Sequence, residues 1–293
     1  MNADVELRVD ARASVGEGPI WDDEKQLLYW VDILSNKLYQ YDPVKDENSA
    51  FDIGQHVGTV VPYARGNRVM LAVYHGFAAF DLDTQELALI NDPEADLPNN
   101  RFNDGKCDPA GRFWAGTMAY ENPTRQGSLY RLDTDLSVHK MLGNIGISNG
   151  IVWSLDNQTM YYIDSMAYTV RAFDYDIDTG DIHKERVIIR IPQEVGLPDG
   201  MTIDTEGMLW IGHFGGGRVC RWHPGSGKIL ETIRLPATNI TACAFGGENL
   251  DTLYITSARV GLTEEALKEQ PLAGGLFSVK PGYQGVKSFR FQG

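Results

Sequence analysis

Cysteine and basic residues are both scarce in this chain, and each shortage counts against a class of protein. The three cysteines, Cys107, Cys220 and Cys243, lie far apart and form no C-x-x-C pair, so we expect neither a disulfide framework nor a structural zinc site. We predict that they are reduced and mostly buried. Lys and Arg total 26 against 40 Asp and Glu, and the net charge is −14. Because phosphate binding requires a basic surface, we expect no nucleic-acid partner.

Long hydrophobic runs and helical periodicity are also missing. No apolar stretch approaches the length of a membrane span, and the first residues, "MNADVELRVDARAS", lack the apolar core of a secretory signal. We therefore expect a cytoplasmic protein without a membrane partner, and no pattern indicates an oligomeric state. The segment nearest to a helix is "LTEEALKEQ" at residues 262–270, which predicts one or two helical turns.

Glycine and aromatic residues are abundant by contrast, and their arrangement favours an all-β fold. The chain contains 31 glycines, and Phe, Trp and Tyr make up 10% of its 293 residues. Gly-rich turns between aromatic and β-branched runs are typical of strands joined by tight turns. A chain of this length can bury its core as one large all-β domain or as two smaller ones.

Aromatic, strand-like runs recur along the chain with a regular period. Five of them read "LLYWVD", "GRFWAGT", "TMYYIDS", "GMLWIGH" and "TLYITSA", and a weaker one, "RVMLAVY", falls between the first two. We predict a single six-bladed β-propeller domain over residues 1–293, with a central channel, because one blade has about this length. A pair of β-sandwiches would explain the strands but not the period. The runs recur every 42–48 residues when aligned on Trp30, Ala72, Trp114, Tyr162, Trp210 and Tyr254.

Four polar residues occupy one register of these repeats. Each stands four positions before an apolar strand residue, and a glycine follows it directly or one residue later. The innermost strands of a propeller start at the same end of the channel, so these side chains should converge there. Thr59 and Thr241 are candidates for the same position in the second and sixth repeats. The four residues are Glu17, Asn103, Asn149 and Asp199.

This ring of two carboxylates and two amides predicts a divalent-cation site. Carboxylate and amide oxygens suit hard cations, and four ligands leave further coordination positions to water. The adjacent glycines allow tight turns and leave space for a ligand. The alternative interpretation is that each polar residue only caps its own turn. Four such residues in one register favour the site.

Several blocks of the sequence carry a family resemblance. They include "GEGPIW", "NNRFNDGKCDPAGRFWAGTM", "ISNGIVWSLD", "YYIDS", "LPDGMTIDTEGMLWI" and "QPLAGGLF". Together they resemble the senescence marker protein, gluconolactonase and luciferin-regenerating enzyme family, and the resemblance spans nearly the whole chain. It implies a six-bladed propeller that binds a divalent metal ion and hydrolyses sugar lactones to aldonic acids.

The resemblance also assigns roles to individual residues. Glu17, Asn149 and Asp199 match the metal ligands of the family, and Arg101 and Asn103 in "RFND" match its substrate-binding pair. In "GTMAYENP", Glu121 falls on the acidic position of the family's lid loop, although the loop is shorter here than in the animal members. Asp104 is either a partner behind the metal ligands or a solvated turn residue.

The chemistry of a lactone, which is a cyclic ester, fits these residue types. A metal ion polarises the carbonyl and activates a water molecule. Asp199 is the candidate for a double role as metal ligand and as the catalytic base that takes the proton of the water. Arg101 can donate hydrogen bonds to sugar hydroxyls or to developing negative charge. The ligand set leaves the metal open among Ca, Mg, Mn, Zn and Fe(II), and the substrate open among gluconolactone, pentonolactones and acidic sugar lactones.

Other functions stay open at this point. The same propeller could be a calcium-binding regulatory protein without turnover, or a metal-dependent organophosphate or ester hydrolase. An interaction scaffold of the WD-repeat type would show a W-D signature and no polar ring. The sequence has no G-x-S-x-G motif, which counts against a serine nucleophile. His213 in "WIGHFGGG" either reaches the channel mouth or packs against its neighbours.

Overall fold

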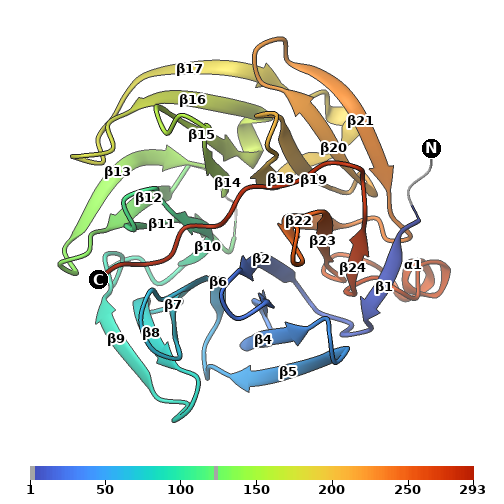
Figure 1. The fold of residues 1–293 in the computed structure, drawn as a ribbon, viewed down its shortest axis with the longest axis horizontal. Helices are drawn as coiled ribbons and strands as arrows, with labels where there is room; N and C mark the ends of the chain where they lie inside the picture. Colours follow the sequence, from blue (N-terminus) through green and yellow to red (C-terminus); the bar gives the residue numbers. More distant parts are fainter. Residues whose placement is uncertain (1–3, 122–124) are drawn as a thin grey trace.

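The computed structural model describes residues 4–121 and 125–293, which form six four-stranded antiparallel sheets around one axis (Figure 1). This arrangement is a six-bladed β-propeller, so the predicted fold is confirmed. Five blades consist of four consecutive strands each, namely β2–β5, β6–β9, β10–β13, β14–β17 and β18–β21. Over these ranges, no helix combines the length and the apolar character needed to cross a membrane. The assignment of residues 1–293 to one domain stays a prediction.

In five blades the strands run outward from the channel in chain order, and in the sixth β1 takes the outermost place. The innermost strands are β2 (Gly16–Asp22), β6 (Val57–Pro62), β10 (Asn100–Cys107), β14 (Ser148–Trp153), β18 (Leu197–Ile203) and β22 (Ile240–Gly246). The second strands are β3 (Leu27–Asp32), β7 (Arg68–Val73), β11 (Phe113–Ala119), β15 (Thr159–Asp164), β19 (Leu209–Phe214) and β23 (Thr252–Ser257). The third strands are β4 (Lys37–Asp42), β8 (Gly76–Asp81), β12 (Gly127–Leu132), β16 (Thr169–Tyr175), β20 (Arg218–His223) and β24 (Leu276–Val279). The outermost strands are β5 (Glu47–Asp52), β9 (Leu87–Asn91), β13 (Val138–Ile145), β17 (Ile182–Arg190), β21 (Lys228–Arg234) and β1 (Glu6–Val9).

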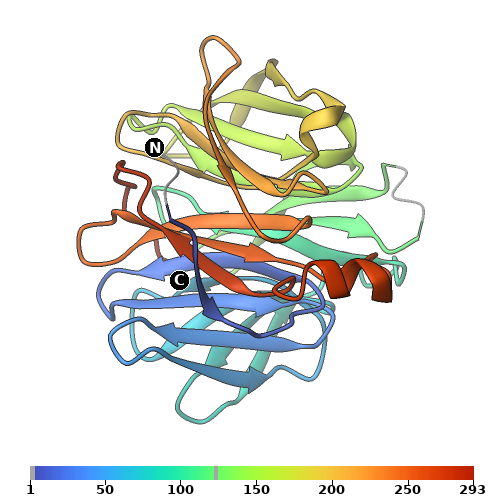
Figure 2. The same cartoon turned by 90° about the vertical axis from the view of Figure 1, so that its right-hand side faces the viewer.

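The sixth blade is built from both ends of the chain. Its sheet has the order β1-β24-β23-β22, so β1 is the outermost strand beside β24 (Figure 2). The Arg8 guanidinium donates to the Ser278 hydroxyl at 2.6 Å across a sequence separation of 270 residues. The predicted helical turn near residues 262–270 is the short helix α1 (Glu264–Glu269), which Thr263 caps. Two single 3-10 turns complete the elements, η1 (Ser165–Ala167) and η2 (Gln193–Val195).

Every innermost strand carries a β-bulge near its start. In each of the six, the register with the second strand shifts by one residue, because the inner strand holds one more residue than its partner. Such bulges bend a strand and re-aim its side chains. The extra residue lies between the paired positions Glu17/Ile20, Val57/Thr59, Phe102/Gly105, Asn149/Ile151, Pro198/Met201 and Ile240/Cys243.

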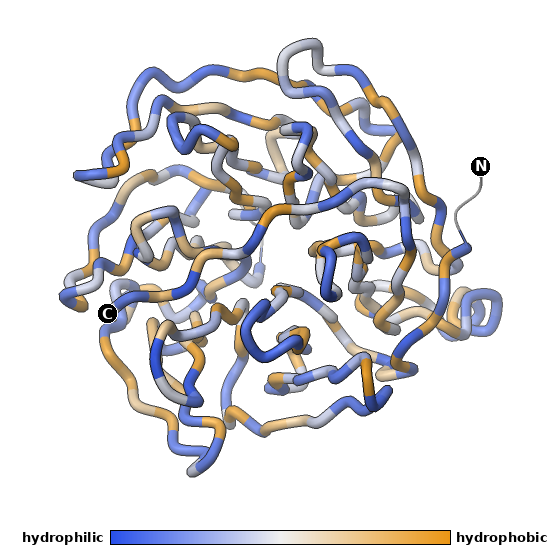
Figure 3. The backbone as a smooth tube through the Cα atoms, in the orientation of Figure 1, coloured by the Kyte–Doolittle hydropathy of each residue, from blue (hydrophilic) through white to orange (hydrophobic). Residues whose placement is uncertain are grey.

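The core lies between neighbouring blades, where the innermost strands are buried along their length. Trp114 and Trp210 are fully buried, and their indole N–H groups donate to Asp108 and Asp204, each at 2.9 Å. These aspartates also accept backbone N–H groups of the turns that follow the innermost strands. The outermost strands mix hydrophobic and hydrophilic residues (Figure 3). The three cysteines are buried and free, as predicted.

The last residues of the chain, 280–293, cross one face of the propeller (red in Figure 1). Phe291 is fully buried, and its backbone N–H donates to the Pro62 carbonyl at 2.9 Å. Arg290 bonds the Asp22 carboxylate at 2.5 Å. This segment, the C-terminal strap, therefore joins blade one to blade two. It covers the end of the channel at which the innermost strands finish.

Candidate metal and substrate site

A cavity of about 300 Å³ lies at the end of the channel where the innermost strands begin. It contains five of the six residues that the sequence assigns to the site, all of them buried: Glu17, Arg101, Asn103, Asn149 and Asp199. Thr241 from blade six also faces the cavity, whereas Thr59 lines a narrower part of the channel of about 10 Å³. Apolar side chains form most of the remaining wall: Val15, Leu34, Met118, Tyr120, Ile147, Leu197, Phe214 and Val260.

The bulges and two glycines place the polar groups in this cavity. Glu17 and Asn149 stand at the edge of the bulges of β2 and β14, and Asp199 lies within the bulge of β18. At Gly150 a Cβ atom would come within 2.8 Å of the Asp199 carbonyl oxygen, so only glycine lets β14 approach β18 this closely. Gly18 adopts a φ of +54°, which favours glycine, and its N–H donates to Glu17 Oε2 at 2.8 Å.

Glu17 and Asp199 lie close enough to influence each other's ionisation. Burial, followed by the charge of Asp104, raises the pKa of Glu17. Burial, followed by the charges of Glu17 and Asp104, raises the pKa of Asp199 well above its usual range. Within residues 4–121 and 125–293, neither carboxylate forms an ion pair with a Lys, Arg or His side chain. Each carboxyl group therefore opposes the ionisation of the other, and a bound cation would favour the charged form of both.

Two buried oxygens next to these carboxylates accept no hydrogen bond from residues 4–121 and 125–293. They are Asn149 Oδ1 and Asp199 Oδ1. The amide nitrogen of Asn149 donates to Ser165 Oγ at 3.0 Å, which fixes the amide so that its oxygen remains free. Buried acceptors are almost always paired, so two orphaned oxygens beside a second carboxylate fit a bound cation. No cluster of three or more His, Cys, Asp and Glu occurs in the described chain, so the donor set depends on the Asn149 amide.

Arg101 and Asn103 form a fixed unit on β10. Arg101 Nη1 donates to Asn103 Oδ1 at 2.7 Å and to the Phe102 carbonyl at 2.9 Å. The Asn103 amide nitrogen donates to the Ser148 carbonyl in blade four at 2.8 Å. Both ends of the Asn103 amide are thus occupied by protein groups, so this residue holds Arg101 in place. Its predicted contact with substrate stays a prediction.

Arg101 is a buried cation without an acidic partner in the part of the chain that the structure describes. Burial lowers its pKa, although the charges of Glu17 and Asp199 act in the opposite direction. Buried arginines are nearly always paired, so the unpaired guanidinium beside the cavity favours a ligand rich in acceptor oxygens.

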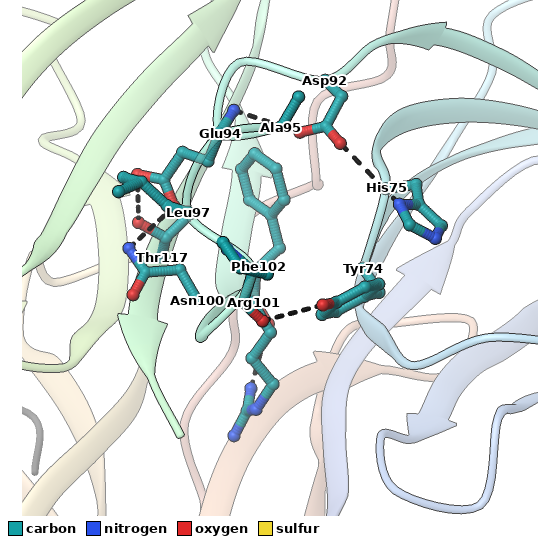
Figure 4. A pocket seen from close by; sticks show the side chains of 11 residues that line it. Tyr74, His75, Asp92, Glu94, Ala95, Leu97, Asn100, Arg101, Phe102 and Thr117 are labelled. Carbon is teal, nitrogen blue, oxygen red and sulfur yellow. Dashed lines mark hydrogen bonds and ion pairs between the residues drawn. The ribbon is translucent and has the colours of Figure 1, made fainter. Parts of the chain in front are cut away.

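A second cavity, of about 80 Å³, also borders Arg101 (Figure 4). Here Glu94 accepts hydrogen bonds from Asn100, Thr117 and Tyr130, each at 3.0 Å. These bonds anchor the start of β10 and the neighbouring strands β11 and β12. In Figure 4 the Arg101 side chain extends away from Glu94 and Thr117. The Glu94 network therefore supports the strand that carries Arg101, while the guanidinium lies elsewhere.

Three other residues singled out from the sequence lie outside the main cavity. The Glu121 side chain is exposed and does not line the cavity, so its contact with substrate stays a prediction. His213 is fully buried and accepts a hydrogen bond from the Trp222 indole at 3.3 Å, which makes it a packing residue. Asp104 is buried beside the narrow part of the channel, and Gly105 N–H donates to it at 2.8 Å. Its interpretation as a solvated turn residue is therefore wrong.

Tyr120 is a cavity residue that the sequence reasoning missed. It follows β11 directly and lies where the resemblance had drawn attention to Glu121. The signal available was the antiparallel pairing of β10 with β11, which places the residue after Ala119 next to Arg101.

Comparison with known proteins identifies the family of the chain. Residues 15–259 match the family model described as the SMP-30/gluconolactonase/LRE-like region. The chain belongs to this family. Among relatives, a protein of Bacillus subtilis (strain 168) assigned as a sugar lactone lactonase, YvrE, is 43% identical over 97% of this chain and 98% of its own. Regucalcin of Gallus gallus is 43% identical over 96% of each chain.

Solved structures of the family have the same fold. A luciferin-regenerating enzyme superposes with a TM-score of 0.93 at 35% identity and covers 99% of both chains. Regucalcin of Agrobacterium tumefaciens str. C58, described as a calcium-binding protein, gives a TM-score of 0.94 at 27% identity over 99% of this chain and 98% of its own. The predicted family membership is confirmed.

Proposed function

We propose that the chain is a metal-dependent sugar lactonase that hydrolyses aldonolactones to aldonic acids. The observation that carries this proposal is the polar floor of the main cavity. There, two carboxylates and a free amide oxygen lie next to a buried arginine that has no acidic partner. The family and the lactonase assigned in Bacillus subtilis support lactone hydrolysis as the reaction class.

Glu17, Asn149 and Asp199 would hold the divalent cation, since they supply two carboxylates and one oriented amide oxygen. When bound there, such an ion provides Lewis acidity toward a lactone carbonyl and lowers the pKa of water. The donor chemistry accommodates Ca, Mg, Mn, Zn or Fe(II).

Asp199 would act as the general base. Its carboxylate lines the cavity, and its Oδ1 accepts no hydrogen bond from the described residues, so this oxygen is available to accept a proton from the attacking water. The water oxygen forms a bond to the carbonyl carbon, and its proton passes to Asp199. The bond between the carbonyl carbon and the ring oxygen then breaks. The ring oxygen takes up this proton from Asp199 and becomes a hydroxyl of the aldonic acid, which returns Asp199 to its carboxylate form.

Arg101 would orient the substrate. Its Nη1 is occupied by Asn103 and the Phe102 carbonyl, whereas its remaining donors have no protein partner among the described residues. These donors can bind ring hydroxyls or the developing oxyanion. A substrate without hydroxyls would leave the buried guanidinium unpaired, which is costly.

The test compares gluconolactone with δ-valerolactone, each corrected for spontaneous hydrolysis, in metal-stripped and reconstituted protein. We expect turnover only after addition of a divalent ion, and a kcat/KM for gluconolactone that is more than about tenfold higher. Equal kcat/KM values would instead indicate a general metal-dependent ester hydrolase. Repeating the assay with Ca, Mg, Mn, Zn and Fe(II), and with pentonolactones and acidic sugar lactones, identifies the ion and the sugar.

A calcium-binding role without turnover is the second candidate. It is favoured by the similarity to a regucalcin that is described as a calcium-binding protein. Calorimetric binding of Ca²⁺ without hydrolysis of any aldonolactone would support this candidate and contradict the lactonase.

A further inference from the structure

Arg101 also contacts Tyr120, a residue to which the family resemblance assigns no role. Tyr120, at the end of β11, places its ring 5.7 Å from the Arg101 guanidinium carbon. This distance lies within the range of a cation–π contact. The ring also forms part of the cavity wall. Tyr120 is therefore in contact with the unpaired cation and faces the same space.

The ring of Tyr120 is held by a residue of another blade. Its hydroxyl shares a hydrogen bond with Nδ1 of His56, and the two ring centroids lie 5.6 Å apart. His56 directly precedes β6 in blade two, and it is half-buried. Blade two contributes no side chain to the wall of the main cavity, so His56 is its connection to the site.

The backbone fixes Tyr120 from a second direction. Its N–H donates to the Asn99 carbonyl at 2.8 Å, which extends the pairing of β10 with β11 by one step. The centroids of the Tyr74 and Tyr120 rings lie 6.2 Å apart, and the Tyr74 hydroxyl donates to the Pro98 carbonyl at 2.8 Å. Protein groups therefore fix the Tyr120 hydroxyl, its backbone N–H and one side of its ring. The side that faces Arg101 and the cavity remains available for contact with a ligand.

We propose that Tyr120 is a positioning and specificity-determining residue for polyhydroxylated lactones, and that His56 holds it in place. The ring fixes the plane of the Arg101 guanidinium, so that its free donors meet the substrate hydroxyls. It also offers an apolar surface to the C–H groups on one side of the sugar ring, since aromatic walls with a few placed polar groups are typical of small-molecule sites. This inference rests on the proposed function and adds a substrate preference to it.

The experiment uses the full chain with metal bound and four variants. Tyr120→Ala removes the ring, Tyr120→Phe keeps the ring but loses the hydroxyl, and His56→Ala removes the anchor. The matched control is Tyr161→Phe, which loses a phenol hydroxyl from a half-buried tyrosine of β15 that lines neither cavity beside Arg101. Each variant is measured on gluconolactone and δ-valerolactone, and its affinity for D-gluconate is measured by calorimetry.

We expect Tyr120→Ala to lower kcat/KM for gluconolactone by about tenfold, mainly through KM, and to weaken D-gluconate binding by a similar factor. The loss on δ-valerolactone should stay below about threefold, because this lactone has no hydroxyls for Arg101 to bind. Tyr120→Phe should recover most of the loss, His56→Ala should fall between the two Tyr120 variants, and Tyr161→Phe should match the wild type.

Three results would overturn the inference. One is unchanged kinetics in Tyr120→Ala. Another is an equal loss on both lactones, which would mean that the ring only supports the fold. The third is a Tyr120→Phe variant as impaired as Tyr120→Ala. A wild type that binds D-gluconate but hydrolyses no lactone would contradict the lactonase alone, and the loss of D-gluconate affinity in Tyr120→Ala would then still support the role of Tyr120. A wild type that neither binds nor hydrolyses would contradict both.

Discussion

The two ends of the central channel are formed by the same six strands, yet they differ in almost every property. Where the strands begin, bulges and glycines open a cavity of about 300 Å³ with unpaired carboxylates and an unpaired arginine. Where the strands finish, the C-terminal strap leaves a cavity of about 50 Å³, lined in part by Val286 and Phe289. The acceptor oxygens of Asn149 and Asp199 at the first end have no donor among the described residues, whereas at the second end the Arg290–Asp22 bond and the buried Phe291 ring fix the strap. Function and stability should therefore respond to different mutations.

The largest difference between the two ends is expected for Asp199→Ala, which changes the end of the channel where the innermost strands begin. We expect turnover to fall by about a thousandfold or more, because the proposed metal ligand and general base are the same residue. The melting temperature should stay unchanged or rise, since a buried carboxylate with a raised pKa is removed. Lactone hydrolysis and calorimetric metal binding are the measurements, with Asp178→Ala, an exposed carboxylate, as control. Retained turnover in the presence of a chelator would remove Asp199 from the site.

The opposite result is expected for Phe291→Ala in the C-terminal strap. Phe291 is fully buried, and its ring centroid lies 5.2 Å from that of Tyr63. Truncating a buried phenylalanine costs about 3–5 kcal/mol of unfolding free energy. Activity per folded molecule should not change. Denaturant unfolding measures the loss, and Phe289→Ala, which is only partly buried, should show a smaller one. A fall in kcat/KM at full folding would show that the two ends are coupled.

We expect Arg101→Lys to cause an intermediate loss of activity without a loss of stability, since Arg101 lies at the same end of the channel as Asp199. Lysine keeps the charge but loses the planar fork that bonds Asn103 and stacks on Tyr120. We expect kcat/KM for gluconolactone to fall by more than about tenfold, which corresponds to about 1.4 kcal/mol. Arg68→Lys, at an exposed arginine stacked on Tyr63 at 4.6 Å, is the matched control and should leave kcat/KM unchanged. An unchanged efficiency in Arg101→Lys would place Arg101 outside the site.

The smallest expected effect is a change in the pH dependence of the unfolding free energy when His213 is replaced. Burial lowers the pKa of His213 to about 4, below the ordinary value of 6.5. Between these values the unfolded chain binds a proton that the folded chain does not, so stability falls as the pH falls from about 6.5 toward 4. The contribution at pH 5 is about 1–2 kcal/mol. In His213→Gln the unfolding free energy should depend less steeply on pH over this range, whereas the exposed control His183→Gln should keep the wild-type slope. Equal slopes in all three proteins would contradict this role.

The period of the repeats was sufficient to predict the propeller, but not the pairing within it. Strand register shows that Tyr29 and Tyr161, and not Trp30 and Tyr162, occupy the position of Trp114. Where two aromatic residues are adjacent, as in "YW" or "YY", the sequence alone does not show which of the two side chains faces a given neighbouring blade. Counting four positions back from an apolar strand residue nevertheless identified four polar residues that line one cavity. The same reasoning was less accurate for Thr59, which lines the narrow part of the channel.

Features that depend on contacts between distant segments could not be predicted. The pairing of β1 with β24 joins residues at opposite ends of the sequence, and no local pattern marks it. The free oxygen of Asn149 depends on Ser165 and on the bulge of β14, which periodicity does not reveal. Tyr120 acquires its importance from a histidine in another blade. Spacing identifies side chains at one end of a channel, but it does not show which of their atoms remain unpaired.

The closing of blade six by β1 has a consequence for the order in which the molecule is assembled. On the ribosome, β1 is made before β24 and must wait for it, because this partner strand follows after about 270 residues. Glu17 and Thr241 come from the two blades that meet at this junction, so the wall of the cavity is completed only when the ring closes. A nascent chain that has made five blades therefore still lacks part of its substrate cavity.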